Sequence, residues 1–273
     1  MTADSGHAGF GPEAYTQGDQ FQRERRNLFG RNWLVFCASG QVAQPGEYVN
    51  QTIGGWPIFT QRGSDGMLRA FHNICRHQGM PIVEKPAGQC DQLRCRYHGW
   101  TYDLTGALAL APPQVAPADP KVQNLNPVSV AESGGLVLVA VKPSAPAPAV
   151  EALAGSAFAA ASSTDAACNW KSLIEAQLAD DAWRFVWPNH FQRSLELGVV
   201  VRQILPRSFS RTRFVDLLFV PAGGTAPPAE ALKALAADAR IQAEALQASR
   251  TAGDLEPSSP AVADFRSRVA AAL

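Results

Sequence analysis

The stretch Cys75-Arg76-His77, followed after seventeen residues by Cys95-Arg96-Tyr97-His98-Gly99-Trp100, carries the strongest structural signal in this 273-residue chain. Each half offers one thiol and one imidazole, in the patterns C-x-H and C-x2-H. Gly79 and Gly99 follow the histidines, where a backbone without a side chain can turn closely around a bound group. The two halves predict a pair of loops that clasp one metal centre from both sides.

The alternation of ligand types distinguishes two kinds of metal centre. A Cys2His2 zinc site pairs like ligands, with C-x2-C at one end and H-x3-5-H at the other. A Rieske [2Fe–2S] cluster instead has two thiolates on one iron and two imidazoles on the other. We therefore interpret the two motifs as Rieske ligands. The predicted ligand set is Cys75, His77, Cys95 and His98.

Other residues near the motifs receive simpler interpretations. Rieske proteins of respiratory complexes add one cysteine to each loop and join the two by a disulfide. Met80 and Tyr97 stand about where those cysteines would lie, so we expect no such disulfide. Cys90 is interpreted as a buried or free thiol, and His72 as a strand residue that flanks the site. The odd total of five cysteines also argues against a disulfide framework.

Composition argues against several functional classes. Lys plus Arg (24) equals Asp plus Glu (24), so the chain lacks the basic excess of a nucleic-acid-binding face or a polybasic membrane anchor. No apolar run approaches the roughly eighteen residues that a membrane-spanning helix needs. Residues 1–18 also lack the layout of a signal peptide. We expect a cytoplasmic protein that binds neither nucleic acid nor a membrane.

Turn signals and apolar periodicity divide the chain into four parts. Residues 1–36 are expected to form a helical and strand segment that packs on the second domain. Residues 37–142 show short β segments between turns, which predicts an all-β Rieske domain. Residues 143–168, rich in Pro, Ala and Ser, are interpreted as a linker. Residues 169–273 are expected to form a smaller α+β domain.

Individual elements are predicted from the same signals. The expected strands of the Rieske domain are Glu47–Gln51, Trp56–Arg62, Leu68–His72, Trp100–Tyr102 and Gly135–Val141. In the following domain, helices are expected at Asn169–Leu178, Ala229–Arg250 and Pro260–Ala272, and strands at Leu195–Leu205 and Arg211–Phe219.

Several stretches together resemble the α subunits of Rieske non-haem iron oxygenases, of the aromatic ring-hydroxylating dioxygenase type. They are Leu28–Trp33, Pro45–Tyr48, Arg69–His77, Cys95–Gly106, and Asn169–Lys171 with Glu175. The resemblance implies an α+β fold, in which an N-terminal all-β Rieske domain precedes a helix-grip-like catalytic-type domain. It also implies that the cluster passes electrons to a mononuclear iron in a neighbouring subunit, held by two histidines and one carboxylate.

The sequence departs from this resemblance at the mononuclear iron. Counted from Asn169, the two iron histidines fall on Ala182 and Trp187. His190 is the only histidine after His98, so the chain cannot supply two. We therefore expect no catalytic residue and no mononuclear iron in this chain.

The rest of the C-terminal part points the same way. Ala239, beside Asp238, stands where the resemblance implies the carboxylate ligand. Only about 105 residues follow Asn169, so the catalytic-type domain is expected to be truncated as well as degenerate. Trp183, Phe185 and Trp187 are interpreted as core aromatics that fill the space of the absent iron and substrate.

The leading hypothesis is a cluster-bearing, non-catalytic α-type subunit of a hetero-oligomeric mono- or dioxygenase of trimer or hexamer type. Its partners would be a paralogous α-type subunit with mononuclear Fe(II) and a ferredoxin or flavin reductase as electron donor. The outer nitrogen of His77 or His98 would hydrogen-bond a carboxylate of the paralogous subunit. Alternatives are a stand-alone Rieske ferredoxin-like carrier and a structural or regulatory pseudo-subunit. A further alternative is an oxygenase with an unusual iron site at His190 with Asp180 or Asp181.

Overall fold

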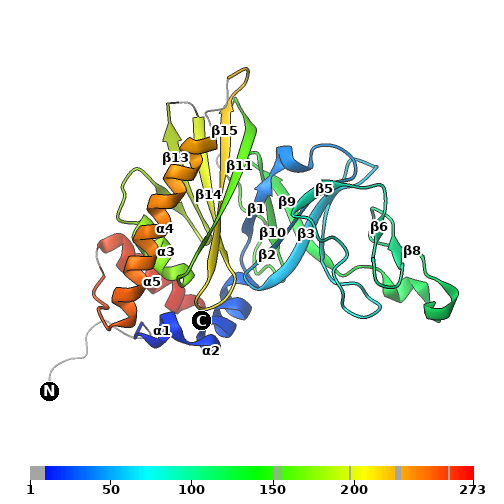
Figure 1. The fold of residues 1–273 in the computed structure, drawn as a ribbon, viewed down its shortest axis with the longest axis horizontal. Helices are drawn as coiled ribbons and strands as arrows, with labels where there is room; N and C mark the ends of the chain where they lie inside the picture. The colour runs from blue at the N-terminus through cyan, green and yellow to red at the C-terminus, as the bar shows by residue number, and fades with distance from the viewer. Residues whose placement is uncertain (1–9, 151–152, 154, 197, 225–228, 258) are drawn as a thin grey trace. The chain divides into compact units, whose positions relative to one another are not determined.

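The computed structural model describes residues 10–150, 153, 155–196, 198–224, 229–257 and 259–273. The chain divides into two compact units, one formed by Trp33–Ala152 and the other by Met1–Asn32 together with Leu153–Leu273 (Figure 1). Within the described ranges, no helix combines the length and apolar character needed to cross a membrane.

A seven-stranded antiparallel sheet forms the frame of the unit Trp33–Ala152, in the order β1-β10-β9-β4-β3-β2-β5. Its strands are β1 (Leu34–Ala38), β2 (Glu47–Ile53), β3 (Trp56–Arg62), β4 (Leu68–His72), β5 (Ala87–Gln89), β9 (Pro127–Ser133) and β10 (Leu136–Ala140). The two-residue turn between β9 and β10 consists of Gly134 and Gly135, both at positive φ. Glycine adopts this conformation without steric cost, which matches the turn to the twist of the hairpin.

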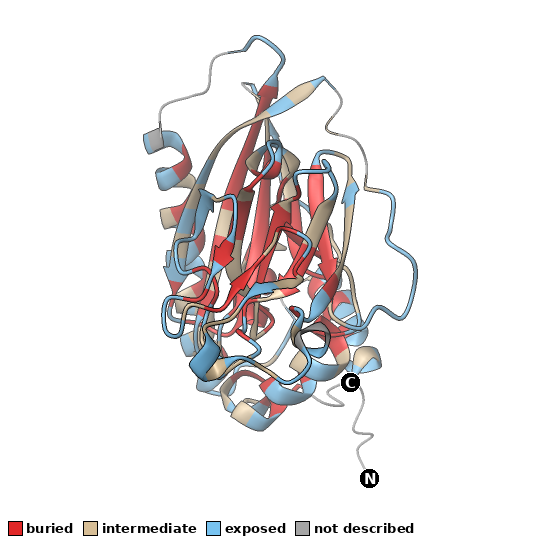
Figure 2. Ribbon diagram, turned by 90° about the vertical axis from the view of Figure 1, so that its right-hand side faces the viewer, coloured by how far each residue is buried: buried red, intermediate tan, exposed pale blue. Residues whose placement is uncertain are grey.

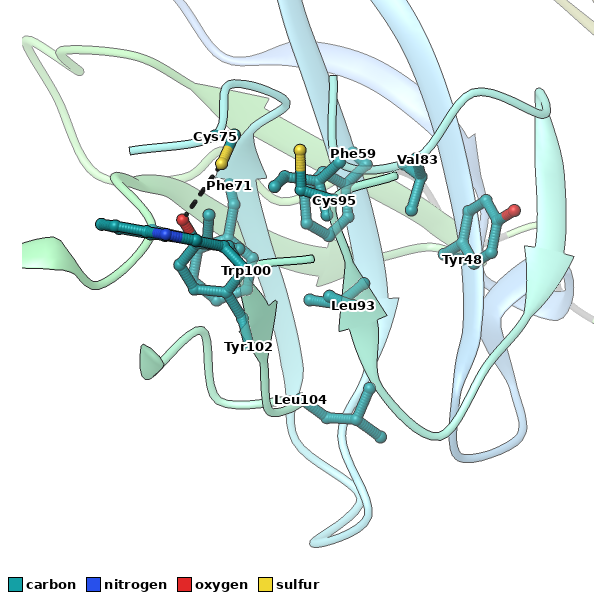
Figure 3. Packing of buried hydrophobic residues seen from close by; sticks show 12 residues of the cluster. Tyr48, Phe59, Phe71, Cys75, Val83, Leu93, Cys95, Trp100, Tyr102 and Leu104 are labelled. Carbon is teal, nitrogen blue, oxygen red and sulfur yellow. Dashed lines mark hydrogen bonds between the residues drawn. The ribbon is translucent and has the colours of Figure 1, made fainter. Parts of the chain in front are cut away.

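A smaller sheet carries one of the two motif loops. It contains β6 (Leu93–Arg94), β7 (Thr101–Tyr102) and β8 (Leu108–Leu110). Short 3-10 helices complete the unit: η2 (Ser39–Val42), η3 (Pro113–Val115) and η4 (Pro120–Gln123). The core between the sheets includes Phe59, Phe71, Leu93 and Tyr102, and the two motif cysteines belong to the same cluster (Figure 3).

The other unit pairs a five-stranded antiparallel sheet with helices. The strands follow the order β11-β15-β14-β13-β12. They are β11 (Ser156–Ala166), β12 (Arg184–Val186), β13 (His190–Leu195), β14 (Gly198–Pro206) and β15 (Thr212–Pro221). The helices are α1 (Glu13–Thr16), α2 (Gly18–Glu24), the π-helical turn η1 (Arg25–Phe29), α3 (Trp170–Gln177), α4 (Ala229–Thr251) and α5 (Pro260–Ala272). In both units, buried residues run along the sheet strands, while the helices expose one side (Figure 2).

The structure agrees with many expected elements and corrects others. β3 and β4 have the predicted bounds, and α3, α4 and α5 differ from them by at most one residue. The interpretation of residues 143–168 as a linker is wrong from Ser156 onward, because Ser156–Ala166 forms the edge strand β11. Small residues favour a strand weakly on their own, and β11 owes its conformation to pairing along the apolar strand β15.

Two further boundaries differ from the expectations. The segment expected as one strand at Leu195–Leu205 is divided by a reversal, because Leu195 ends β13 and pairs with Gly198 of β14. Within the expected N-terminal segment 1–36, residues up to Asn32 belong to the second unit, whereas Leu34–Ala38 is a strand of the seven-stranded sheet.

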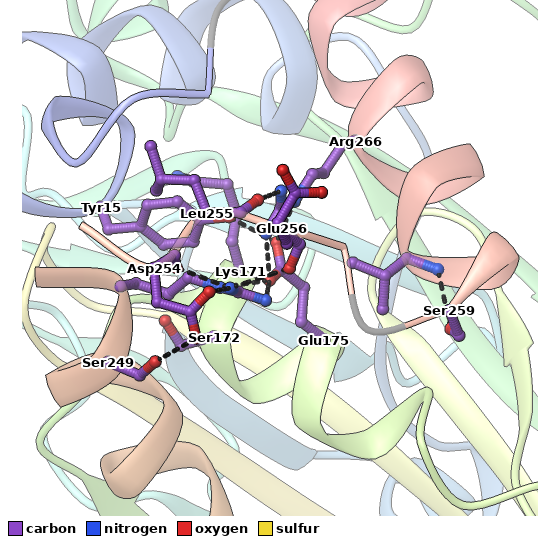
Figure 4. Close-up of polar contacts among 12 residues, drawn as sticks. Tyr15, Lys171, Ser172, Glu175, Ser249, Asp254, Leu255, Glu256, Ser259 and Arg266 are labelled. Atoms are coloured by element: carbon purple, nitrogen blue, oxygen red, sulfur yellow. Dashed lines mark hydrogen bonds and ion pairs between the residues drawn. The ribbon is translucent and has the colours of Figure 1, made fainter. Parts of the chain in front are cut away.

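Buried ion pairs attach the N-terminal helices to α3. The Lys171 ammonium lies 2.5 Å from the Glu24 carboxylate, and neither side chain is exposed. Glu175 accepts hydrogen bonds from Tyr15 Oη at 2.5 Å and from Arg266 Nε at 2.9 Å (Figure 4). Each charge has a partner of opposite sign, which makes its burial tolerable.

A second buried pair joins β14 to β15. Arg202 donates two hydrogen bonds to Asp216, at 2.7 and 2.9 Å, and a third to Gln177 at 2.5 Å. The guanidinium also lies 4.5 Å from the Trp183 ring and 4.8 Å from the Phe214 ring. Arg202 therefore depends on Asp216 for its only counter-charge among the residues that the structure describes.

Replacing Asp216 tests this dependence. Asp216→Ala would leave the Arg202 charge buried and unpaired, so the free energy of unfolding should fall by about 3–5 kcal/mol. Urea denaturation followed by circular dichroism measures the change. Asp264→Ala breaks an exposed pair with Arg268 and should cost only about 0–1 kcal/mol. Equal losses for the two variants would contradict the assignment.

Candidate metal centre

The two motif loops repeat one backbone arrangement. In the first loop the Cys75 N–H donates to Met80 O at 2.7 Å, and the Gly79 N–H donates to Cys75 O at 2.9 Å. In the second loop the Cys95 N–H donates to Trp100 O at 2.8 Å, and the Gly99 N–H donates to Cys95 O at 3.0 Å.

Both loops therefore close through the same pair of bonds, counted from their cysteine. Gly79 and Gly99 both lie at positive φ, 76° and 71°, where any other residue would be strained. The first loop follows β4 of the large sheet, and the second joins β6 to β7. Two sheets thus present two similar loops.

The structure brings the four predicted ligands together with a gradient of exposure. Cys75 and Cys95 are each 2% exposed, whereas His77 is half-buried and His98 is exposed. The two imidazole rings lie edge to face with centroids 4.6 Å apart. The sulfur donors therefore lie inside the unit, and the imidazole rings lie nearer its surface.

The surroundings of the sulfurs fit an iron–sulfur cluster. Burial raises the pKa of the Cys95 thiol, and the adjacent Cys75 thiol raises it further. Backbone N–H groups of Tyr97 and His98 donate to the same sulfur and lower its pKa. Thiolates bound to metal need such donors, because a metal ligand is deprotonated in a site that excludes water.

The His77 imidazole gives an independent fit. Its Nδ1 is buried and has no hydrogen-bond partner among the described residues. The ring is fixed by stacking on Trp100, with centroids 5.0 Å apart and planes 14° from parallel. A buried nitrogen without a partner on a fixed ring is a costly arrangement that binding to a metal would relieve.

Two supporting residues were not identified from the sequence. Asn73 Oδ1 accepts from the N–H groups of Ile82 and Val83, at 2.8 and 3.1 Å. These bonds join the residue that precedes the first loop to the residues that follow it. Tyr102 Oη accepts from the Arg76 N–H at 3.1 Å and lies 3.4 Å from Cys75 Sγ. Because the hydroxyl oxygen already accepts from Arg76, its proton can be donated to the Cys75 sulfur. The position of both residues within the motif stretches was the only signal in the sequence.

The structure also places the other residues singled out near the two motifs. All five cysteines are free thiols, so no disulfide joins the two loops. Tyr97 is 49% exposed, and Met80 is half-buried beside the core cluster. Cys90 is half-buried, and burial raises the pKa of its thiol. His72 lies in β4, as predicted.

Aromatic side chains gather where the resemblance places the mononuclear iron. Ala182 is exposed, while Trp187 lies 6.4 Å from the rings of both Phe185 and Phe265. Phe185 also packs on Phe191 at 4.9 Å. Of the three aromatics expected in the core, Trp183 is buried, whereas Phe185 and Trp187 are half-buried.

The alternative iron site gains no support from the geometry. His190 is buried, and neither of its ring nitrogens has a hydrogen-bond partner in the described part of the chain. Asp180 lies 3.4 Å from Arg193, and Asp181 is exposed. Among the described residues, no three His, Cys, Asp or Glu side chains are grouped to hold one ion. A Rieske cluster has no such requirement, because each of its irons takes two protein ligands.

Comparison with known proteins identifies the class of this site. Residues 32–129 match the Rieske [2Fe-2S] domain family, so this part of the chain is a Rieske domain, which supports a [2Fe–2S] cluster. More particularly, stretches of 101 and 128 residues of the chain are similar to oxygenase subunits, one of them a dioxygenase subunit alpha.

Two relatives illustrate the extent of this similarity. The chain is 40% identical to the chlorobenzene dioxygenase subunit alpha of Cupriavidus sp. (strain PS12) over 101 residues, 37% of this chain and 22% of that protein. It is 32% identical to the glycine betaine monooxygenase oxygenase subunit of Pseudomonas aeruginosa (strain UCBPP-PA14) over 128 residues, 46% of this chain and 30% of that protein. The matches thus span less than a third of each relative.

Solved structures show the same fold. The quaternary ammonium Rieske monooxygenase CntA in complex with L-carnitine superimposes with a TM-score of 0.80 at 20% identity, covering 100% of this chain and 99% of that chain. Naphthalene 1,2-dioxygenase with bound indole gives 0.72 at 16% identity, covering 91% and 82%. The chain therefore has a Rieske β domain and an α+β domain resembling those of oxygenase α subunits.

Tyr102 provides a test of the sulfur environment. A hydrogen bond to a ligand sulfur stabilises the more negative, reduced cluster, so Tyr102→Phe should lower the reduction potential. Loss of about 1.4 kcal/mol corresponds to about 60 mV for one electron. Redox titration of the visible absorption measures the shift. Tyr97→Phe removes a hydroxyl from an exposed tyrosine of the second motif loop and should leave the potential unchanged. An unchanged potential in Tyr102→Phe would refute the assignment.

His190 makes the stability of the chain depend on pH. Burial, together with the nearby positive charge of Arg184, lowers its pKa to about 4. The unfolded chain takes up this proton near pH 6.5, whereas the folded chain resists it down to about pH 4. The free energy of unfolding should therefore decrease as the pH falls through this window, by on the order of 3 kcal/mol.

A substitution isolates this contribution from other titrating groups. His190→Leu fills the site without a titratable group, so its unfolding free energy should change less between pH 7 and pH 4.5. Urea titrations at the two pH values give the comparison. A pH dependence equal to that of the unaltered chain would show that His190 is not responsible.

Proposed function

We propose that this chain is a Rieske cluster-bearing, non-catalytic α-type subunit of a hetero-oligomeric Rieske oxygenase. Cys75 and Cys95 would hold one iron, and His77 and His98 the other. The bound cluster supplies one-electron transfer. The observation that carries the proposal is the complete ligand set, on two loops of equal backbone geometry, in a domain of the Rieske family.

The exposure of the four ligands supports one route by which electrons would leave the cluster. The cysteines are buried, while His98 reaches the surface and His77 is half-buried. Electrons would therefore leave through the imidazole side. The outer N–H of His98 or His77 would donate to a carboxylate of the neighbouring subunit, which fixes the distance between the centres. A related quaternary ammonium Rieske monooxygenase structure is described as giving insight into inter-subunit electron transfer, which supports this arrangement.

The acceptor iron is assigned to a different chain. Ala182 has no metal-binding atom, and the Trp187 ring packs among aromatic neighbours. We infer a paralogous α-type partner that keeps its mononuclear Fe(II), in a cytoplasmic complex of trimer or hexamer type. A ferredoxin or a flavin reductase would supply the electrons.

A stand-alone electron carrier is the second candidate function. The exposed His98 edge would serve a soluble acceptor as well as a fixed partner. The α+β unit, which resembles an oxygenase domain, favours the subunit instead. A structural or regulatory pseudo-subunit is the third candidate. In it the cluster would stabilise the fold and would not transfer electrons.

Iron and acid-labile sulfide analysis tests the cofactor assignment. The purified chain should contain two irons and two sulfides, and Cys75→Ser should lose both, because it removes a buried ligand. Cys90→Ser, at a thiol outside the two loops, should retain them. A third iron per chain, without additional sulfide, would contradict the absence of a mononuclear site.

Reconstitution with the paralogous subunit separates the candidate functions. Substrate turnover should require both chains, and His98→Ala should abolish turnover while the two chains still assemble. Turnover by this chain alone would refute the proposal. Turnover that follows assembly regardless of His98 would favour the pseudo-subunit, and reduction of a separate oxygenase by the monomer would favour the carrier.

A further inference from the structure

A cavity in the second unit is lined with arginines and belongs to none of the features described above. Its volume is about 300 Å3. It lies at the end of the β14–β15 hairpin, beside the end of β11 and the helix α4. Its walls are formed by Asp165, Ala166, Ala167, Arg207, Arg211, Arg213 and Glu244.

The hairpin holds three guanidinium groups at this cavity. The Arg207 N–H donates to Arg211 O at 3.0 Å, so one tight turn carries both side chains. Arg211 immediately precedes β15 and Arg213 is the second residue of this strand, and both line the cavity. Thr212 between them is buried instead, and its Oγ1 donates to Cys168 O at 2.9 Å.

The backbone of the hairpin is anchored, so the turn that carries the exposed Arg207 and Arg211 does not depend on a ligand for its position. Asn169 Nδ2 donates to Phe209 O at 2.8 Å, which ties the tip of the turn to the start of α3. The Ala167 N–H donates to Glu244 Oε1 at 2.8 Å, which ties the adjacent wall to α4. A preformed site loses less conformational entropy on binding.

The carboxylates of the cavity are already engaged. Asp165 accepts two hydrogen bonds from its cross-strand neighbour Arg213, at 2.9 and 2.7 Å. Glu244 accepts from the backbone of Ala167. The guanidinium groups of Arg207 and Arg211 have no ion-pair or hydrogen-bond partner in the part of the chain that the structure describes. The cavity therefore has an excess of one positive charge and two unpaired guanidinium groups.

The surrounding charge reaches the one central carboxylate. Arg213 lowers the pKa of Asp165, and Arg207 and Arg211 lower it further. The positive charges of all three arginines thus stabilise the charged form of the same carboxylate. Three guanidinium groups that line one cavity repel one another unless negative charge is placed between them.

We propose that this cavity is a binding site for a small dianion of the phosphate type. Guanidinium groups pair with phosphate oxygens through two parallel N–H donors each. A phosphate offers three or more acceptor oxygens, which matches several guanidinium groups better than a single planar carboxylate does. Phosphate bound here contacts Arg207 and Arg211 directly, with Arg213 held behind them by Asp165.

Titration calorimetry of the full chain with inorganic phosphate tests the proposal. Binding should be saturable, and Arg207→Ala/Arg211→Ala should weaken it by at least about tenfold, since each charged hydrogen bond contributes about 1.5 kcal/mol or more. The matched control, Arg26→Ala/Arg268→Ala, removes two positive charges from exposed positions of the same unit that do not line the cavity. This control should retain full affinity.

A gain of affinity provides a second, independent variant. Asp165→Asn frees Arg213 from its ion pair and removes a negative charge from the cavity, so phosphate should bind several-fold more tightly. Equal weakening in both double-arginine variants, or unchanged affinity in both, would overturn the proposal. Succinate binding as tightly as phosphate would assign the cavity to carboxylates instead. Thermal melting of each variant shows that the fold is retained.

Discussion

The Rieske unit depends on one constraint: two separate loops must present their donor atoms to the same point while water is kept from the sulfurs. The backbone meets it with two loops closed by the same pair of hydrogen bonds, each ending at a glycine in the left-handed region. The sheets set the spacing between the loops, and Asn73 and Tyr102 tie the first loop to its surroundings. The apolar core that contains the cysteines is therefore part of the metal site.

The second unit depends instead on buried charges that are paired with one another. It buries full charges and pairs each of them, either with groups from distant parts of the sequence or, for Arg202, across the β14–β15 hairpin. Glu175 on α3 is surrounded by Tyr15, Arg250 and Arg266, and Arg202 is held by Asp216. Such groups contribute less net stability than apolar residues of the same size, but they tolerate few alternative arrangements. The Glu175 contacts fix α1, α4 and α5 to α3, while Arg202 joins β14 to β15 and, through Gln177, to α3.

The sequence predicts some of these features and not others, for physical reasons. Strands β3 and β4 are short segments rich in apolar and aromatic residues that end at clear turns, so local patterns are sufficient. The cluster ligands are identifiable because their chemistry requires four residues at fixed spacing. Strand β11 was missed because alanine and serine carry little local preference, and its partner β15 lies about fifty residues later. The roles of Asn73 and Tyr102 depend on contacts that exist only after folding.

The division of the chain has a consequence for its biosynthesis. Trp33–Ala152 is one continuous segment, whereas the other unit combines Met1–Asn32 with Leu153–Leu273. The inserted segment can fold as soon as it leaves the ribosome. The earliest helices must wait, because Tyr15 and Glu24 find their partners only at Glu175 and Lys171. These helices therefore complete their packing only after the later part of their own unit has been synthesised.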